Sequence, residues 1–277
     1  TAGIQDYWPQ DYDFAAMEKP VTPRQILDRW AKKPLDFEPG TAWQYSNTGY
    51  VVAGMIIEKA SGMKLLDYLQ KKIFKPLGMN DTDFFVPADK AHRFAACYSA
   101  DPQGGFNPLA AERKGTLTLQ DDPTTSTFLS PPSLISGGGG LCSTAADYLT
   151  FCRALLNGGE LGGVRLLGPK TLKLMASNHL PGGVDLPAMS RSMFAEAAYN
   201  GIGFGLGFAV TMHPAQTLIA GSPGEYNWGG AATTSFWIDP AEELITIFMT
   251  QVLPSSAYPI RRELRSMVYA AITESNL

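Results

Sequence analysis

The sequence is poor in cysteine and charge, and it has no long hydrophobic run. Its three cysteines, Cys97, Cys142 and Cys152, form no C-x-x-C pair, and their odd number argues against a disulfide scaffold. The longest unbroken apolar run, from Tyr50 to Ile57, is far shorter than the roughly 18 residues that a membrane-spanning helix needs. Only 17% of the residues are charged, 22 basic against 26 acidic, and no basic run exceeds a pair. We therefore expect neither a membrane span nor nucleic acid as a partner.

The rest of the composition is that of a globular protein. With 277 residues and 45% hydrophobic side chains, the chain can bury a large core, as one large domain or two interleaved ones. Cys152 falls on the apolar side of a predicted helix and is interpreted as a small buried hydrophobe. The cysteine pattern fits a reducing compartment and favours the cytoplasm, while the start at Thr1, without Met or signal peptide, leaves export open.

Helical periodicity dominates the first 200 residues. Apolar spacing, a proline start and glycine stops predict helices at 22–33, 48–60, 64–74, 144–158 and a short one from 169. The stretch 81–140 is rich in Pro, Gly, Ser and Thr and predicts long irregular connections, ending on four consecutive glycines. We expect residues 1–200 to form a mostly helical subdomain with long loops.

The period changes from 3.6 to 2 after about residue 200. Alternation predicts strands at 206–212, 218–221, 232–238 and 243–252, followed by a C-terminal helix at 259–273. From Gly201 to Gly207, glycine alternates with apolar side chains, as in a backbone that is closely approached on one face. Residues 201–277 are therefore expected to form an antiparallel sheet with a terminal helix, and the predicted fold class is α+β.

Common catalytic signatures are missing. The chain has no H-E-x-x-H, no phosphate-binding G-x-x-x-x-G-K, no G-x-G-x-x-G and no G-x-S-x-G. His92, His179 and His213 are too scattered to predict a metal site, and we expect no metal and no cofactor.

Two short motifs remain as candidates for chemistry. Tyr45-Ser46-Asn47 follows a Pro-Gly turn and precedes an apolar helix, and Trp228-Gly229-Gly230-Ala231 stands at the start of a predicted strand. Glycines at such a position permit close approach of the backbone to a ligand. Taken singly, each also has a plain structural interpretation: a loop tyrosine that caps a helix, and a tryptophan that packs over a β-turn.

Together the motifs resemble a known family. Phe37-Glu38-Pro39-Gly40, Tyr45-Ser46-Asn47-Thr48-Gly49-Tyr50, the run from Gly138 to Asp147, Trp228-Gly229-Gly230 and Trp237-Ile238-Asp239-Pro240 occur in the order and spacing of the serine β-lactamase-like hydrolases. The Trp-Gly-Gly version resembles the family VIII carboxylesterases, relatives of the class C β-lactamases. The resemblance covers nearly the whole chain and implies a β-lactamase-like fold, an antiparallel sheet flanked by helices.

The resemblance also implies roles for the motif residues. In this family a serine is acylated. Tyr45 would share the general-base role, its pKa depressed by neighbouring cations, and Asn47 would hold the catalytic lysine and contact substrate. Trp228-Gly229-Gly230 replaces a Lys-Thr-Gly motif on an edge strand, and the N–H of Ala231 would be an oxyanion donor. Without that motif's lysine, a neutral ester is a better substrate than an anionic β-lactam.

The family's nucleophile lies in S-x-x-K at a helix N-terminus, ahead of the tyrosine motif. The only S-x-x-K here, Ser61-Gly62-Met63-Lys64, follows that motif at the end of a predicted helix, and we interpret it as fortuitous. Thr1-Ala2-Gly3-Ile4 resembles the stretch that follows the nucleophile helix. We therefore expect the nucleophilic Ser and its Lys upstream of Thr1, on the same chain or on an N-terminal segment supplied as a separate chain.

The leading hypothesis is a serine carboxylesterase acting on short-chain esters. Two alternatives remain: β-lactamase, D,D-peptidase or D-amino-acid amidase activity on a β-lactam-like or peptide substrate, and a non-catalytic scaffold or binding protein. Faster turnover of nitrocefin than of esters would favour the first. An unchanged function after Tyr45→Phe would favour the second.

Overall fold

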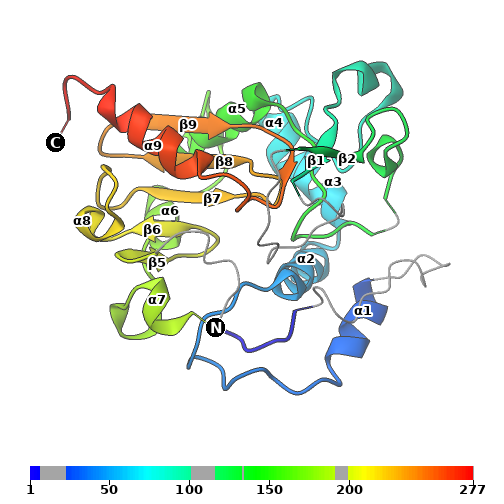
Figure 1. Ribbon diagram of the computed structural model, residues 1–277. Helices are drawn as coiled ribbons and strands as arrows, with labels where there is room; N and C mark the ends of the chain where they lie inside the picture. Colours follow the sequence, from blue (N-terminus) through cyan, green and yellow to red (C-terminus); the bar gives the residue numbers. More distant parts are fainter. Residues whose placement is uncertain (7–22, 101–115, 133, 191–198, 277) are drawn as a thin grey trace. The chain divides into compact units, whose positions relative to one another are not determined.

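The protein is described by a computed structural model, which covers residues 1–6, 23–100, 116–132, 134–190 and 199–276 (Figure 1). The chain divides into two compact units, each made of discontinuous segments. Unit 1 comprises Thr1–Ala91, Thr127–Thr144 and Ser190–Ser192, and unit 2 comprises His92–Ser126, Ala145–Met189 and Met193–Leu277. Helices and antiparallel strands both occur, so the α+β class is confirmed. The expected subdomains 1–200 and 201–277 stay a prediction.

Unit 1 contains the first helices of the chain. They are α1 (Pro23–Trp30), α2 (Asn47–Ser61), α3 (Leu65–Leu69), the π-helical turn η1 (Gln70–Phe74), α4 (Lys75–Leu77) and the 3₁₀ turn η3 (Thr127–Leu129), with η2 (Ala88–Arg93) at the boundary to unit 2. The helix expected at 48–60 is confirmed as α2, which begins after the N-cap Ser46 and ends at Gly62. Gly62 takes the left-handed conformation (φ 69°) that a glycine adopts at low cost.

The helix expected at 64–74 is longer than the sequence pattern indicated. It continues through η1 into α4, so Pro76 lies inside the helical run instead of ending it. Pro76 is in the first turn of α4, directly after the π-helical turn. Inside a helical run a proline removes one i→i−4 hydrogen bond, and here it stands where the run changes from π-helical to α-helical.

Unit 2 is built on a five-stranded antiparallel sheet. Its strands are β5 (Ile202–Phe204), β6 (Ala209–Thr211), β7 (Tyr226–Gly229), β8 (Ser235–Asp239) and β9 (Leu244–Phe248), in the order β5-β6-β7-β8-β9. A second sheet has the order β10-β1-β2 (Val252–Leu253, Cys97–Ser99, Thr118–Asp121), and β3 (Glu160–Leu161) pairs with β4 (Val164–Arg165). In the described part of this unit the helices are α5 (Ala145–Leu156), α6 (Pro169–Met175), η4 (Pro181–Gly183), α7 (Leu186–Met189), α8 (Pro214–Thr217) and α9 (Ile260–Ala270).

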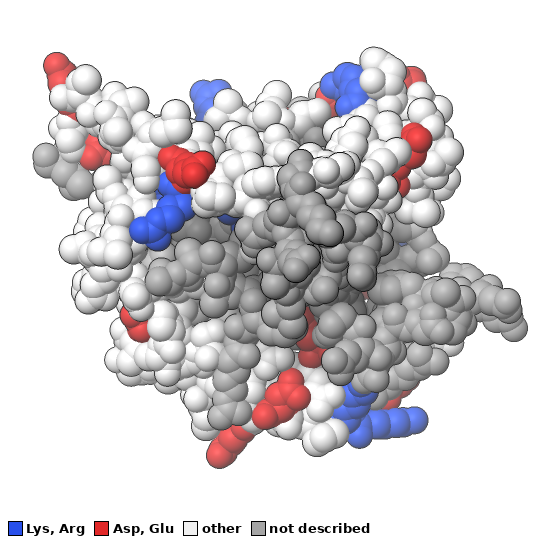
Figure 2. All heavy atoms as spheres, in the orientation of Figure 1, with Lys and Arg blue, Asp and Glu red and all other residues white. Residues whose placement is uncertain are grey.

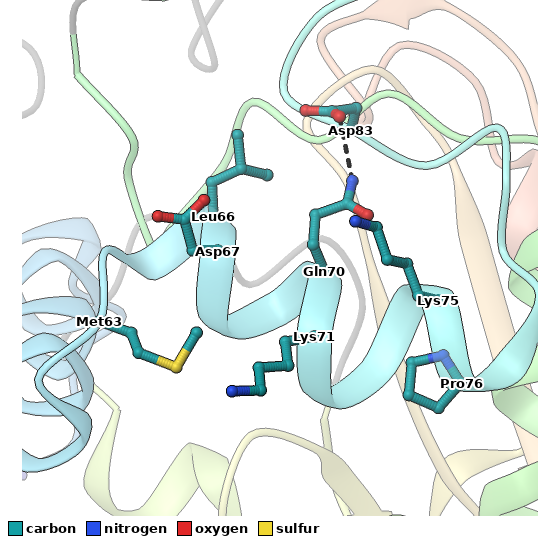
Figure 3. A pocket seen from close by; sticks show the side chains of 8 residues that line it. All are labelled: Met63, Leu66, Asp67, Gln70, Lys71, Lys75, Pro76 and Asp83. Carbon is teal, nitrogen blue, oxygen red and sulfur yellow. Dashed lines mark hydrogen bonds between the residues drawn. The ribbon is translucent and has the colours of Figure 1, made fainter.

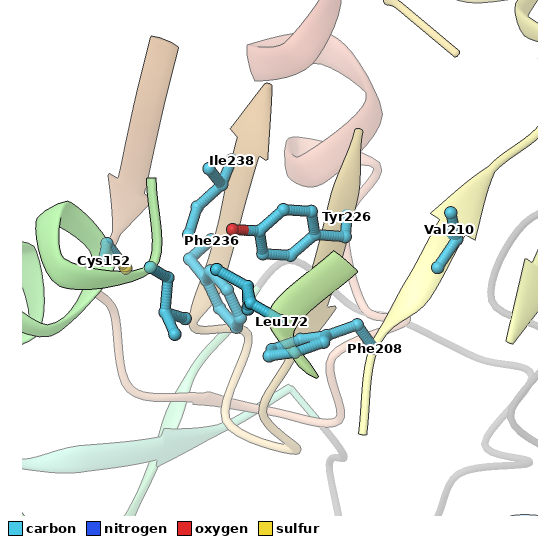
Figure 4. Close-up of a cluster of buried hydrophobic side chains, with 8 residues drawn as sticks. Cys152, Leu172, Phe208, Val210, Tyr226, Phe236 and Ile238 are labelled. Carbon is cyan, nitrogen blue, oxygen red and sulfur yellow. The ribbon is translucent and has the colours of Figure 1, made fainter. Parts of the chain in front are cut away.

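One face of the five-stranded sheet packs against α5 and α6 and forms the core of unit 2 (Figure 4). Phe236 and Ile238 point to this face from β8, and Tyr226 points to it from β7, where they meet Cys152 of α5 and Leu172 of α6. Cys152 and Ile238 are fully buried, which confirms the interpretation of Cys152 as a small buried hydrophobe. Burying a side chain such as Ile238 contributes about 1.5–3 kcal/mol.

The opposite face of the same sheet carries α9. Because side chains alternate along a strand, Trp237 and Asp239 lie on the other face from Phe236 and Ile238. Both contact α9: Arg265 lies over the Trp237 ring, and the Tyr269 hydroxyl bonds Asp239. The predicted C-terminal helix is thus confirmed as a cover for this face.

For the region after residue 200, one expectation is wrong and another is confirmed. No strand forms at 218–221: the chain turns after α8 at Leu218, which takes the left-handed conformation (φ 59°) and is 79% exposed. The apolar stretch resembled a strand only locally. The close approach expected at the alternating glycines is made by the protein's own loop, since a Cβ on Gly203 would lie 2.4 Å from the Asn178 side chain and one on Gly205 would lie 2.1 Å from the Met175 carbonyl.

Candidate active site

Tyr45 lies in the loop of unit 1 that leads into α2, directly before the N-cap residue Ser46. Its side chain is half-buried, and its ring centroid lies 5.9 Å from that of Tyr50 on the first turn of the helix. Ser46, between Tyr45 and the helix, accepts a hydrogen bond from the N–H of Gly49 (3.0 Å). This N-cap fixes where the helix begins and therefore where the Tyr45 backbone lies relative to it. Burial raises the pKa of Tyr50, which keeps that neighbouring phenol protonated.

Asn47 begins α2 and is bound to a residue that the sequence analysis missed. Its Nδ2 donates to Oδ2 of Asp6 (3.0 Å), while Oδ1 of Asp6 accepts from the Thr48 N–H (3.2 Å) and lies 3.4 Å from the Thr48 hydroxyl. An acidic group at a helix N-terminus is stabilised by the exposed N–H groups and the helix dipole. No sequence signal linked Asp6 to Asn47, because 41 residues separate them.

The glycine run at 137–140 packs against this same end of α2. A Cβ on Gly137 would lie 2.4 Å from the Tyr50 carbonyl oxygen, and one on Gly138 would lie 3.2 Å from the Tyr50 Cβ and 3.4 Å from the Asn47 carbonyl oxygen. Any larger residue would push the loop away from the helix. The run therefore serves the close packing of a loop on the helix that carries the Tyr45–Asn47 motif.

The second motif lies in unit 2, at the end of a strand and not at its start. Trp228 and Gly229 are the last residues of β7, and Gly230 and Ala231 belong to the turn into β8. Nor is β7 an edge strand as the resemblance implied, since it stands between β6 and β8. However, the β6 ladder reaches only to Asn227, so the motif projects past the end of β6. The Trp228 ring packs edge-on against Phe204, with ring centroids 5.2 Å apart.

The two glycines of this motif are already in contact with the protein. A Cβ on Gly229 would lie 2.6 Å from Nη2 of Arg261, a residue of α9, and one on Gly230 would lie 2.2 Å from the Thr234 hydroxyl. Arg261 was not found from the sequence. Ala231, at the tip of the turn, is exposed, and its N–H has no hydrogen-bond partner among the residues that the structure describes. Such an N–H can donate to a ligand oxygen.

The predicted site residues therefore form two groups, Tyr45 and Asn47 in unit 1 and Trp228 to Ala231 in unit 2. Within each group the residues lie together, and their roles stay predictions. Ser61 is the last residue of α2 and donates to the Ile57 carbonyl (2.6 Å), whereas Lys64 precedes α3. Ser61 and Lys64 therefore do not share a helical turn, which agrees with the interpretation of this S-x-x-K as fortuitous.

Cys152 is not a nucleophile at neutral pH. It is fully buried, and burial raises the pKa of its thiol to about 12. A reactive cysteine needs a lowered pKa and access to solvent. Over the described part of the chain, no group of three or more His, Cys, Asp or Glu is placed to hold a metal ion.

Unit 1 also has a surface pocket of about 840 Å³ (Figure 3). Helices α3 and α4 and the turn η1 provide most of its lining, which includes Met63, Lys71 and Lys75, and Gln70 donates to Asp83 (3.0 Å) across it. Neither Tyr45 nor Asn47 lines this pocket.

On the face drawn in Figure 2, the charged side chains of the described residues are dispersed. Figure 2 shows Lys and Arg of the described residues in separate small groups on this face, with Asp and Glu between them. Among the described helices, none is both long enough and apolar enough to cross a membrane.

Three comparisons place the chain among known proteins. A family model described as Beta-lactamase matches residues 1–269. Protein Rv1367c of Mycobacterium tuberculosis (strain H37Rv) is 33% identical over 228 residues, 81% of this chain and 52% of that protein. Lovastatin esterase of Penicillium rubens is 28% identical over 262 residues, 89% of this chain and 59% of that protein. The chain thus spans between half and three fifths of the length of these relatives.

Solved structures agree on the fold. The structure of EstCE1, described as a hydrolase with promiscuous acyltransferase activity, matches 96% of this chain and 69% of its own, with a TM-score of 0.72 at 24% identity. At that identity the likeness shows the β-lactamase-like fold alone. Since the family model spans nearly all of the sequence, the chain belongs to the Beta-lactamase family.

Proposed function

We propose that this chain forms part of a serine carboxylesterase that cleaves short-chain esters through an acyl-serine intermediate. The observation that carries the proposal is the Ala231 N–H, which has no hydrogen-bond partner among the described residues and directly follows a Trp-Gly-Gly motif in a chain of the Beta-lactamase family. An unpartnered N–H of this kind can donate a hydrogen bond to an ester carbonyl oxygen and stabilise the negative charge that develops there. The similarity to a lovastatin esterase supports an ester substrate over a β-lactam.

The proposed roles follow the motifs. Tyr45 takes the proton of the nucleophilic serine and returns it to the leaving alcohol, and Asn47 holds the catalytic lysine and contacts substrate. Asp6, bound to the Asn47 amide, would orient it. The serine and lysine themselves are proposed to come from sequence outside these 277 residues. The Trp228 side chain carries no charge, and the Arg261 guanidinium beside Gly229 is bound to the Gly230 and Thr234 carbonyl oxygens, which suits a neutral ester better than a carboxylate-bearing substrate.

The test uses the full-length protein to which this sequence belongs. Wild type is expected to be labelled by a fluorophosphonate probe and to hydrolyse p-nitrophenyl acetate and butyrate. Tyr45→Phe should lower kcat by about 10²–10⁴-fold, the range for removal of a general base. Tyr98→Phe, at an exposed strand position, is the matched control and should leave kcat unchanged.

Two other results would redirect the interpretation. Faster turnover of nitrocefin or of a D-alanyl-D-alanine peptide than of the esters would favour the amidohydrolase alternative, which the family membership also allows. No labelling and no turnover, with Tyr45→Phe indistinguishable from wild type in its other properties, would favour a scaffold or binding protein.

A further inference from the structure

Arg261, near the start of α9, reaches back to the turn that carries Ala231. Its Nη2 donates to the carbonyl oxygen of Gly230 (2.5 Å) and to that of Thr234 (2.8 Å). The guanidinium lies against the Cα of Gly229, where a Cβ would come within 2.6–3.0 Å of its Nη2, Cζ and Nη1 atoms. Glycine at 229 is thus what allows a cation to lie flat against the end of β7.

The carbonyl that Arg261 binds belongs to the same peptide unit as the Ala231 N–H. A peptide unit is planar, and in the trans form its C=O and N–H point in opposite directions. Holding the Gly230 oxygen therefore sets the direction of the Ala231 N–H. A positive charge on the carbonyl side also polarises the amide and makes its N–H a stronger donor.

We infer that Arg261 is a positioning residue for the oxyanion donor, aiming and polarising the Ala231 N–H through the Gly230–Ala231 peptide. The inference rests on the proposed function, because the donor role of Ala231 belongs to that proposal. Arg261 itself touches neither substrate nor reacting atoms in this scheme. Its effect is on the transition state, since the charge on the substrate oxygen develops only there.

Other bonds hold the turn independently of Arg261. The Thr233 N–H donates to the Gly230 oxygen (3.1 Å), the Gly230 N–H to the Thr234 oxygen (2.9 Å), and the Thr233 hydroxyl to the Val252 oxygen (2.6 Å). The Val252 N–H donates to the Ala232 oxygen (3.1 Å). A variant without Arg261 therefore keeps the turn, because the Thr233 N–H still holds the Gly230 oxygen. What it loses is the shorter of the two hydrogen bonds that orient the Gly230–Ala231 peptide, and the positive charge that polarises it.

The experiment compares Arg261→Ala with Arg262→Ala in the full-length protein, with p-nitrophenyl butyrate as substrate and a boronic acid as transition-state analogue. Arg262 is the adjacent, exposed residue of α9 and serves as the matched control. Removal of a whole oxyanion donor costs about 10²–10³ in kcat, so misdirecting one should cost about 10–100-fold. We expect Arg261→Ala to lower both kcat and the affinity for the boronic acid by that factor, with KM unchanged. Arg261→Lys should recover part of the loss. Arg262→Ala should change neither kcat nor the affinity for the boronic acid.

A second variant keeps the arginine and displaces it. Gly229→Ala places a methyl group where the guanidinium lies, so it should lower kcat in the wild-type background and have little further effect beside Arg261→Ala. If Arg261→Ala does not fold, Gly229→Ala alone tests the positioning role: a folded Gly229→Ala variant with the kcat of wild type would overturn it.

The outcomes separate the two proposals. An active wild type with equal kcat in Arg261→Ala and Arg262→Ala would overturn the positioning role alone, as would a rise in KM at constant kcat. A wild type that neither reacts with the fluorophosphonate nor turns over esters would overturn the proposed function and this inference with it.

Discussion

Replacement of Tyr269 by phenylalanine tests whether a buried acidic cluster fastens α9 to the sheet. The Tyr269 hydroxyl lies 2.5 Å from Oε2 of Glu225 and 2.8 Å from Oδ2 of Asp239, and both carboxyl groups are fully buried. Arg265, one turn earlier on α9, forms an ion pair with Glu225. A phenol has one proton to donate, so its second contact needs a proton on a carboxyl group. Burial raises the pKa of Glu225 and outweighs the opposing effects of Arg265 and Tyr269.

The substitution removes one oxygen and leaves the packing in place. The phenylalanine ring still fills the site and still lies near the Arg265 guanidinium, whose Cζ is 5.9 Å from the ring centroid. Two hydrogen bonds to acidic groups are lost, and a bond of this kind contributes about 1.5–3 kcal/mol. Because the bonds share one hydroxyl and are not additive, we expect the free energy of unfolding to fall by about 2–4 kcal/mol.

Thermal and urea unfolding of the full-length protein measure this loss. For a domain of this size, 2–4 kcal/mol corresponds to a fall in Tm of about 5–15 °C. Tyr148→Phe is the matched control, because Tyr148 is a half-buried tyrosine of the same unit that packs edge-on against Phe236 and has no hydroxyl partner in the described part of the chain. A loss below about 1 kcal/mol for Tyr269→Phe, or one equal to that of Tyr148→Phe, would refute the reasoning.

Two further predictions concern acidic residues. The pKa of Glu225 is raised in the folded state, so its stabilising contribution is present below its unfolded pKa and is lost as the pH rises through the folded value. In wild type, ionisation of Glu225 should therefore contribute to a fall in Tm as the pH rises. Glu225→Gln should remove that contribution, and a Tm–pH profile identical to that of wild type would contradict a raised pKa for Glu225. Asp6→Ala should lower the free energy of unfolding by about 1–2 kcal/mol, because Asn47 and Thr48 lose their partner at the start of α2. Asp28→Ala, in an exposed ion pair on α1, should cost less than about 0.5 kcal/mol in the same unfolding assay.

Local patterns located the longer helices and the strands β6, β8 and β9, but not the short strands β1 to β5, β7 and β10. The helix after Tyr45-Ser46-Asn47 begins and ends where its cap residues indicated, and the strands β8 and β9 and the helix α9 follow from apolar periodicity. The strand expected at 218–221 was wrong, because a short apolar run resembles a strand whenever its long-range partners are unknown. In the structure the chain turns at Leu218 instead.

The candidate site was predictable as motifs but not as geometry. The order and spacing of Tyr45-Ser46-Asn47 and Trp228-Gly229-Gly230 indicated the family, which the comparisons show. The same motifs carried no sign of Asp6 or of Arg261, because these residues reach their partners from 41 and 31 positions away in the chain. A glycine in a strand predicts that something comes close, and only the structure shows that an arginine side chain fills that space at Gly229.

The sequence by itself therefore determined the fold class, the longer helices, the strands β6, β8 and β9, and the family, since each depends on periodicity and spacing along the chain. Only the tertiary structure decided which side chains meet. Arg261 lies over Gly229, Asp6 binds the Asn47 amide, and Glu225, Asp239 and Tyr269 form one cluster. The physical reason is that hydrogen bonds and burial between distant residues arise from packing of the faces of elements. Periodicity tells which face of an element is apolar, but it does not tell which residue of another element will lie against it.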